Sequence, residues 1–156
     1  MAQQQLSILL GNETACLEHL LSILEQEHES LLVADIDVIE RATSAKNQAL
    51  DAQTNATLLR QDFAVQHSFD RTTEGLQSFI ASFENPDKLL QFFNHLTDLV
   101  HQCSDMNSIN GHLIRQKQIQ TRSALNIIRQ TDASAHTYSG QGDTSDTPTT
   151  RSLGEA

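Results

Sequence analysis

The fold is decided by residues 85–131, whose sequence is NPDKLLQFFNHLTDLVHQCSDMNSINGHLIRQKQIQTRSALNIIRQT. Pro86 suits the first turn of a helix, and Asp87 favours the positive end of the helix dipole. An unbroken helix over 86–131 would be about 69 Å long, which exceeds an ordinary globular core. Such a rod needs partner helices beside it. Its apolar residues recur at helical spacing: Leu89, Phe93, Leu96, Val100 and Cys103, then Leu113, Ile114, Ala124, Leu125 and Ile128.

Two stretches on the N-terminal side have the periodicity to supply those partners. Leucines within 4–33 alternate in steps of three and four, with Glu13 and Glu27 in the same register. A second helix is predicted over 35–67, where Asp35 is a helix-capping residue type. The residues expected to face inward on this second helix are Ile36, Ile39, Leu50, Leu58, Leu59 and Phe63.

A shorter amphipathic stretch, 68–84, lies between the second helix and the long one. Its apolar residues have helical spacing, and Pro86 ends any helix before it. We therefore predict an all-α fold. It is an antiparallel helical bundle of three long helices, with or without one extra short helix, and it has a disordered C-terminal tail.

The composition changes at Asp132. Thirteen of the last 25 residues are Ser, Thr, Gly or Pro, and no apolar periodicity remains. Such a segment buries too little apolar surface to offset the entropy of ordering it. The predicted organisation is a helical bundle domain over 1–131 and a flexible, partner-binding tail over 132–156.

Charge is unevenly distributed along the chain. Residues 1–40 carry eight acidic side chains and no Lys or Arg, whereas residues 106–131 carry four basic side chains and no acidic one. Antiparallel pairing of the first and the long helix would place these opposite charges near each other and select a register. The net charge of −10 excludes nucleic acid as a partner, because phosphate binding needs a basic face.

Further sequence features bear on the location of the protein. The longest apolar run is only a few residues, so no membrane insertion is expected. The N-terminus lacks the charged and apolar regions of a secretion signal. Cys16 and Cys103 lie on or near apolar stripes, as buried free thiols do in a reducing cytosol. We expect a cytoplasmic protein.

Two carboxylate–histidine pairs, Glu25 with His28 and Asp98 with His101, have the spacing of a metal site in a helical bundle. Such a site also needs an inward Glu from each of two other helices, so solvated residues at the edge of the apolar face are the better interpretation. Neither cysteine has a local feature of a nucleophile, and the chain has no phosphate-binding loop. We expect no enzyme, no catalytic or metal-binding residue and no cofactor.

Asn107, Asn110 and Gly111 interrupt the apolar stripe of the long helix. The two Asn residues fall on the stripe defined by Val100 and Cys103, where an amide costs stability and fixes register. Gly111 indicates a close backbone approach or a bend. A local kink or helix end with no function beyond packing is an equally open interpretation.

The chain resembles a known family. The acidic, leucine-rich first helix is similar to the family pattern, as is a second helix that begins near Asp35 and carries Lys46. Towards the C-terminus the chain has a further set of matching residues, namely Asn107, Asn110-Gly111 and Leu113-Ile114, then Ala124-Leu125 and Ile128, then Tyr138, Gly140 and Gly142. This set resembles the C-terminal signature of FlgN-type flagellar export chaperones. Ser139 departs from that signature, because the family tends to place Gly directly after the Tyr.

This resemblance implies a cytoplasmic export chaperone. The sequence does not fix the oligomeric state, and we favour a monomer. Such a chaperone would bind flagellar hook-associated proteins, prevent their premature assembly and deliver them to components of the flagellar type III export apparatus. A generic helical adaptor without export function is the alternative, and a carboxylate-bridged metal enzyme is the third. The expected partner-binding residues are Asn107, Asn110, Gly111, Leu113, Ile114, Leu125, Ile127, Ile128, Tyr138, Gly140 and Gly142.

Overall fold

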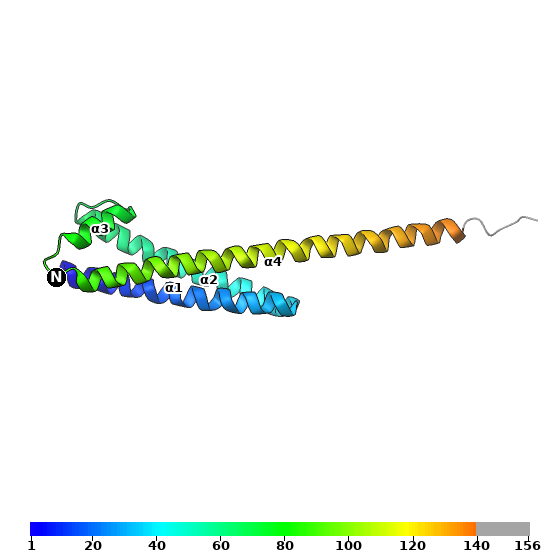
Figure 1. The fold of residues 1–156 in the computed structure, drawn as a ribbon, viewed down its shortest axis with the longest axis horizontal. Coiled ribbons are helices and arrows are strands. Elements are labelled where there is room, and N and C mark those ends of the chain that lie inside the picture. Colours follow the sequence, from blue (N-terminus) through cyan, green and yellow to red (C-terminus); the bar gives the residue numbers. More distant parts are fainter. Residues whose placement is uncertain (140–156) are drawn as a thin grey trace, which may run out of the picture. The chain divides into compact units, whose positions relative to one another are not determined.

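The structure is a computed structural model that describes the backbone of residues 1–139 and the side chains of residues 1–131. The chain divides into two units, Met1–Ile114 and Arg115–Ala156. Residues 1–139 contain no strand, and the predicted all-α fold of three long helices and one short helix is confirmed. The helices, drawn in Figure 1, are α1 (Ala2–Val33), α2 (Ile36–Gln66), α3 (Thr73–Ala81) and α4 (Asp87–Ser139).

The helix bounds differ from the predicted ones mainly around α3 and at the end of α4. The short helix covers Thr73–Ala81 rather than 68–84, because residues 67–72 form the turn that separates it from α2. α4 is one continuous helix that passes through 107–111 and continues beyond Thr131 to Ser139. The helix extends beyond Thr131 because each further residue forms another backbone hydrogen bond, and because Ala, which occurs in this stretch, favours helix. The rest of the predicted tail, residues 140–156, lies outside the described residues.

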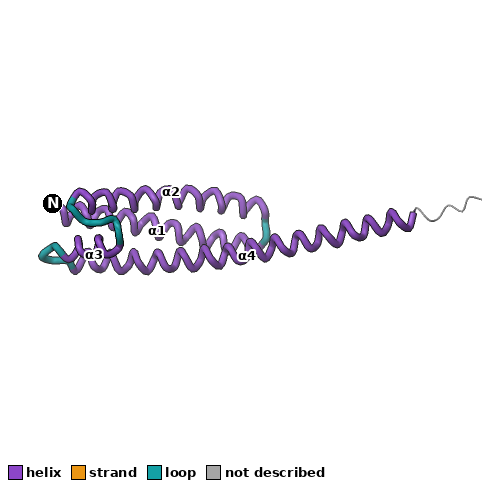
Figure 2. The backbone as a smooth tube through the Cα atoms, turned by 90° about the horizontal axis from the view of Figure 1, so that it is seen from above, coloured by secondary structure: helices purple, strands orange, loops and turns teal. Residues whose placement is uncertain are grey.

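α1 and α2 form an antiparallel hairpin (Figure 2). Ala34 ends α1 in the left-handed conformation, with φ 62°, and its N–H donates to the Ser30 carbonyl oxygen at 3.0 Å. Asp35 then caps α2, because its Oδ1 accepts a hydrogen bond from the Val38 backbone N–H at 3.2 Å. The predicted capping role of Asp35 is confirmed.

α1 and α4 run parallel, so the predicted antiparallel pairing of the first and the long helix is wrong. The Cys103 thiol donates to the Leu17 carbonyl oxygen at 3.6 Å. Seven residues further along both helices, Asn110 donates to the Leu24 carbonyl oxygen at 2.8 Å. The chain reverses between α1 and α2 and again between α2 and α4, which returns the long helix to the direction of α1 (Figures 1 and 2).

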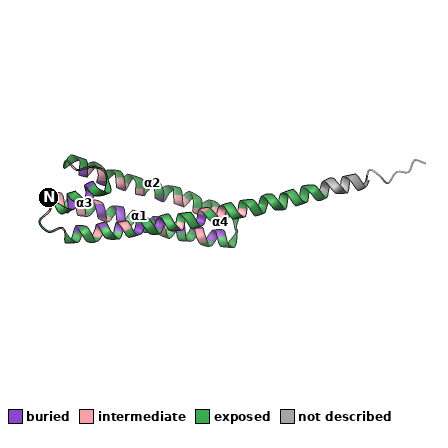
Figure 3. Ribbon diagram, turned by 45° about the horizontal axis from the view of Figure 1, so that its top comes forward, coloured by how far each residue is buried: buried purple, intermediate pink, exposed green. Residues whose placement is uncertain are grey.

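Apolar burial in the unit Met1–Ile114 comes mainly from α1, α3 and α4 (Figure 3). Burying one large aliphatic or aromatic side chain stabilises a fold by about 1.5–3 kcal/mol. The predicted stripe is wrong at four positions, because Val100, Ala124, Leu125 and Ile128 are exposed. The large buried residues are Leu6, Leu10, Leu17, Leu20, Ile23, Leu24 and Leu31 of α1, Leu76, Phe79 and Ile80 of α3, and Leu89, Phe93, Leu96 and Leu99 of α4.

α2 packs through a different face from the one predicted. Four of the residues expected to face inward, Ile36, Leu50, Leu58 and Leu59, are between 41 and 72 % exposed, while Ile39 and Phe63 are half-buried. The packed face contains small and polar side chains, because α1 presents two acidic residues to α2 and carboxylates need donor groups when they are buried. This face follows steps of four and three through Ala42, Lys46, Ala49, Gln53, Ala56, Arg60 and Phe63.

The first turn of α3 leaves no room for a side chain at Gly75. The Thr72 hydroxyl oxygen caps the helix by accepting a hydrogen bond from the Gly75 N–H at 3.0 Å. This contact folds the preceding loop closely over the helix. A Cβ atom on Gly75 would lie 2.3 Å from the carbonyl oxygen of Asp70.

Gly75→Ala is therefore expected to lower the free energy of unfolding by about 1–3 kcal/mol, because the loop backbone must shift. Urea unfolding followed by circular dichroism measures this change. Gly11 provides the matched control, since a Cβ built there has no heavy atom within 4 Å. Gly11→Ala should raise the free energy of unfolding by about 0.5–1 kcal/mol. Equal effects of the two substitutions would contradict the close approach at Gly75.

Candidate functional site

A buried carboxylate on α1, Glu13, holds α2 in place. Glu13 is 2 % exposed and pairs with the Arg60 guanidinium, whose Nε donates to one carboxylate oxygen and whose Nη2 donates to the other at 3.2 Å. The Thr57 hydroxyl donates to Glu13 Oε1 at 2.6 Å, and Gln53 donates to the Thr57 oxygen at 2.9 Å. Both carboxylate oxygens of Glu13 therefore have donors.

A second buried carboxylate, Glu27, joins all three long helices. Lys46 of α2 donates to its Oε1 at 2.6 Å, and Asn110 of α4 donates to its Oε2 at 2.9 Å. The Asn110 side chain is fully buried, and its Oδ1 accepts from the His28 Nδ1–H at 3.0 Å. Among the side chains of residues 1–131, no buried polar atom lacks a hydrogen-bond partner.

These polar contacts fix the register of the helices. Glu13 and Glu27 lie 14 residues apart on α1, and their partners Arg60 and Lys46 lie 14 residues apart on α2 in the opposite order. A shift by one helical turn would separate both pairs and leave charges buried without partners, which is strongly unfavourable. Asn110 places the same constraint on α4, because a buried amide must keep its hydrogen bonds.

The residues around Asn110 differ in what they offer to a partner. Asn110 has no exposed surface, which supports the interpretation that it fixes the register of the helices. A partner protein would contact Asn110 only if α4 separated from α1. Asn107 is exposed rather than on the buried stripe. Gly111 is half-buried and lies within a continuous helix, and Leu113 and Ile114 are half-buried as well.

Residues 115–131 of α4 are largely exposed (Figure 3), and their apolar residues are Ile119, Ala124, Leu125, Ile127 and Ile128. Every side chain in this range is exposed except Lys117, which is half-buried. The predicted contact residues Leu125, Ile127 and Ile128 are thus accessible. Gathered apolar exposure of this kind is typical of an interaction site. The exposed fractions are 65 % for Ile119, 49 % for Leu125, 64 % for Ile127 and 57 % for Ile128.

The last predicted contact residues lie at the limit of the structure. Tyr138 belongs to the helical part of α4. The Tyr138 side chain, Gly140 and Gly142 lie outside the described residues.

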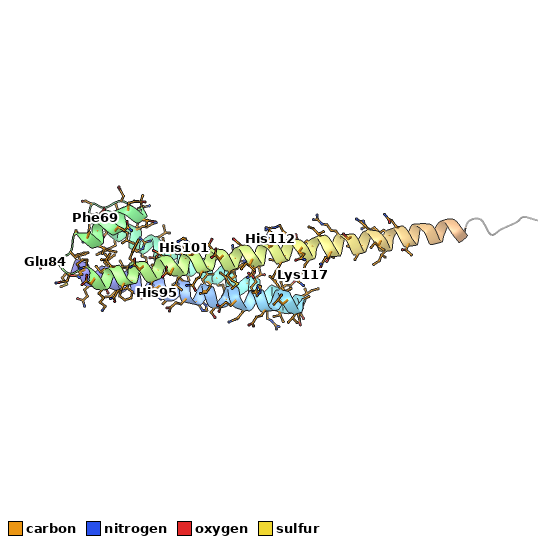
Figure 4. The ribbon with its side chains drawn as sticks, in the orientation of Figure 1. Phe69, Glu84, His95, His101, His112 and Lys117 are labelled. Carbon is orange, nitrogen blue, oxygen red and sulfur yellow. The ribbon has the colours of Figure 1, made fainter. Side chains whose placement is uncertain are left out.

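Neither carboxylate–histidine pair forms a metal site. Glu25, Asp98 and His101 are exposed, and His28 is engaged with Asn110. His95, labelled in Figure 4, lies 3.2 Å from Glu18 of α1, and both side chains are more than half exposed. Within the part of the chain whose side chains are described, no group of three His, Cys, Asp or Glu residues could hold a metal ion.

Both cysteines are free thiols, with Cys103 buried and Cys16 half-buried. Burial raises the pKa of the Cys103 thiol, and the negative charge of Glu25 raises it further. A raised pKa keeps the sulfur protonated, so Cys103 packs as a neutral group rather than serving as a nucleophile. None of the helices within residues 1–139 is both long and apolar enough to cross a lipid bilayer.

Comparison with known families identifies the class of protein. The family model described as FlgN protein matches residues 1–146. The chain belongs to the FlgN family. FlgN proteins are flagellar export chaperones without enzymatic activity, so the predicted family and the predicted non-enzymatic role are confirmed.

One solved structure has a similar fold. It is a crystal structure described as a flagella synthesis protein FlgN from Pseudomonas aeruginosa, and it is 22 % identical to this chain with a TM-score of 0.61. The match covers 76 % of this chain and 91 % of that chain. At this identity the likeness to the Pseudomonas protein concerns the fold alone. No curated protein sequence matches this chain.

Proposed function

We propose that this FlgN-family chain binds flagellar hook-associated proteins in the cytoplasm, prevents their premature assembly and delivers them to the export apparatus. Membership of the FlgN family supports the export role. The single observation that carries the binding role is the apolar surface exposed along residues 115–131.

This surface suits recognition of an amphipathic segment. Leu125 and Ile128 are three residues apart and are therefore neighbours on the helix, while Ala124 and Ile127 widen the apolar area. A partner that lays its own apolar side on this area buries both surfaces. Each Leu or Ile that becomes fully covered contributes about 1.5–3 kcal/mol to the gross interaction. A hook-associated protein whose apolar segment is covered in this way is unable to use that segment for assembly.

The other predicted contact residues remain part of the proposal. Asn107 is exposed in the unit Met1–Ile114, so a bound segment reaches it without rearrangement of the bundle. Tyr138, Gly140 and Gly142 are proposed to contribute contacts from the C-terminal region. Asn110 contributes to binding by holding α4 in register rather than by direct contact.

Leu125→Ala combined with Ile128→Ala is expected to weaken binding of purified hook-associated proteins at least tenfold, or about 1.4 kcal/mol. The melting temperature should be nearly unchanged, because both side chains are exposed in the free chain. Isothermal titration calorimetry measures the affinity, and circular dichroism monitors the melting.

Leu58→Ala combined with Leu59→Ala is the matched control, since these leucines expose similar apolar surface on α2, at 44 and 62 %. The control should bind as tightly as the unmodified chain. Equal affinities of the two double variants would move the binding surface away from residues 115–131. If the unmodified chain binds none of the hook-associated proteins, the export role fails and the generic adaptor replaces it.

A further inference from the structure

The charge of residues 115–131 sets them apart from the rest of the chain. They hold four basic residues and no acidic one, whereas residues 1–114 hold five basic and sixteen acidic residues. Residues 132–156 are acidic as well, with four acidic residues and one Arg. The segment that contains the most exposed large apolar residues of α4 is therefore also the cationic segment of an otherwise acidic protein.

Two of these cations border the apolar surface. Leu125 is three residues from Arg122 and four from Arg129, so on the helix surface its side chain neighbours both guanidinium groups. Arg122, Leu125 and Arg129 are all exposed. Arg115 precedes Arg122 by the same seven residues that separate Arg122 from Arg129, so the basic residues recur along one side of the helix. The apolar surface therefore has a basic edge, defined by Arg115, Arg122 and Arg129.

We infer that this basic edge selects a partner helix whose apolar stripe is bordered by Asp or Glu residues. An acidic residue opposite Arg122 or Arg129 gains a charge-assisted contact, whereas a basic residue there is repelled. The inference rests on the proposed function, because it names the chemistry of the segment that a hook-associated protein presents to residues 115–131. Charges at such a border set specificity and association rate more than total affinity.

Two other occupants match the surface less well. A symmetric pair of chains joined through residues 115–131 would bring four cations of one copy against four of the other, which opposes association. An anionic membrane would attract the cations, but the segment has no Trp, Phe or Tyr to enter the interface, and the rest of the chain is strongly acidic.

Charge reversal tests the inference. Arg122→Glu combined with Arg129→Glu should weaken binding of purified hook-associated proteins at least tenfold at about 0.1 M salt. The difference should shrink at about 1 M salt, where the screening length falls to roughly 3 Å. Glu and Arg have similar helix propensities, so α4 should remain helical, which circular dichroism verifies.

Arg41→Glu combined with Lys88→Glu is the matched control. Both cations are exposed and lie outside the segment, and their reversal changes the net charge by the same amount. Unchanged affinity of this control supports the inference. Equal weakening in both double variants would assign the effect to net charge and overturn it. Full affinity of the Arg122 and Arg129 variant would overturn it while leaving the proposed function in place.

Vesicles of phosphatidylcholine and phosphatidylserine provide a second test. The unmodified chain should not sediment with them. If it does, and if charge reversal abolishes sedimentation while hook-associated proteins still bind at full affinity, the basic edge serves a membrane and the inference is overturned. Absence of any binding between the unmodified chain and hook-associated proteins overturns the proposed function, and the inference falls with it.

Discussion

Arg60→Ala is expected to lower the free energy of unfolding by about 3–5 kcal/mol, because it leaves the Glu13 carboxylate buried without its cation. Glu13 is 2 % exposed and Arg60 is 8 % exposed, so water does not replace the lost guanidinium. The Thr57 hydroxyl remains as a donor but carries no charge to balance the carboxylate. Equilibrium unfolding in urea, compared with the unmodified chain, measures the loss.

The surface pair of Arg71 with Asp62 gives a matched control. Its atoms lie 2.8 Å apart, but both side chains are more than half exposed, so Arg71→Ala should cost no more than about 1 kcal/mol. Replacing both members of the buried pair, as Glu13→Leu with Arg60→Met, should restore much of the stability lost by Arg60→Ala. A loss below about 1 kcal/mol for Arg60→Ala would show that the buried pair is not a structural requirement.

Asn110→Ala is expected to lower the free energy of unfolding by about 2–4 kcal/mol. The substitution removes the donor to Glu27 and to the Leu24 carbonyl oxygen, together with the acceptor for His28. Each buried polar group left without a partner costs about 1–3 kcal/mol, and more when it is charged. Urea unfolding again measures the change.

Asn107→Ala is the control for Asn110→Ala on the same helix. Asn107 is exposed, so its replacement should change the free energy of unfolding by no more than about 0.5 kcal/mol. Equal losses for the two substitutions would contradict the structural role of the Asn110 hydrogen bonds, because helix propensity favours Ala over Asn at both positions.

The packing of α1 could be predicted from its sequence because large residues mark its buried face. Its leucines recur in steps of three and four, and they are buried. The same rule identified most of the buried residues of α4, where Leu89, Phe93 and Leu96 carry the pattern. Where helices pack by burying large apolar side chains, the helical periodicity and the residue types identify the same buried face.

The packed face of α2 could not be predicted in this way, since its residues share a regular spacing but are not large apolar side chains. The predicted inward face was based on Leu50, Leu58 and Leu59, which are exposed in the structure. Ala and charged residues occupy the packed positions instead. One sequence signal could have found that face. The 14-residue interval between Lys46 and Arg60 equals the interval between the two acidic residues on the leucine register of α1, as an antiparallel pairing requires.

The candidate binding surface stays a prediction, and only the accessibility of its residues can be compared with the structure. Leu125, Ile127 and Ile128 are accessible, because every side chain from Arg115 to Thr131 except Lys117 is exposed. Asn110 was grouped with them because sequence spacing alone does not distinguish an amide that fixes register from one that meets a partner. That distinction needs the positions of Leu24, Glu27 and His28.

The parallel pairing of α1 and α4 has a consequence for biosynthesis. The leucines of α1 leave the ribosome first, but the apolar residues that cover them lie more than 80 positions later, as the Cys103–Leu17 and Asn110–Leu24 contacts illustrate. At translation rates of about 5–20 residues per second, roughly 4–15 s separate the end of α1 from the arrival of residue 110. During that interval α2 offers α1 mainly Ala and charged side chains. The nascent chain therefore exposes a leucine stripe of its own until translation is well advanced, so this export chaperone is itself vulnerable to aggregation while it is being made.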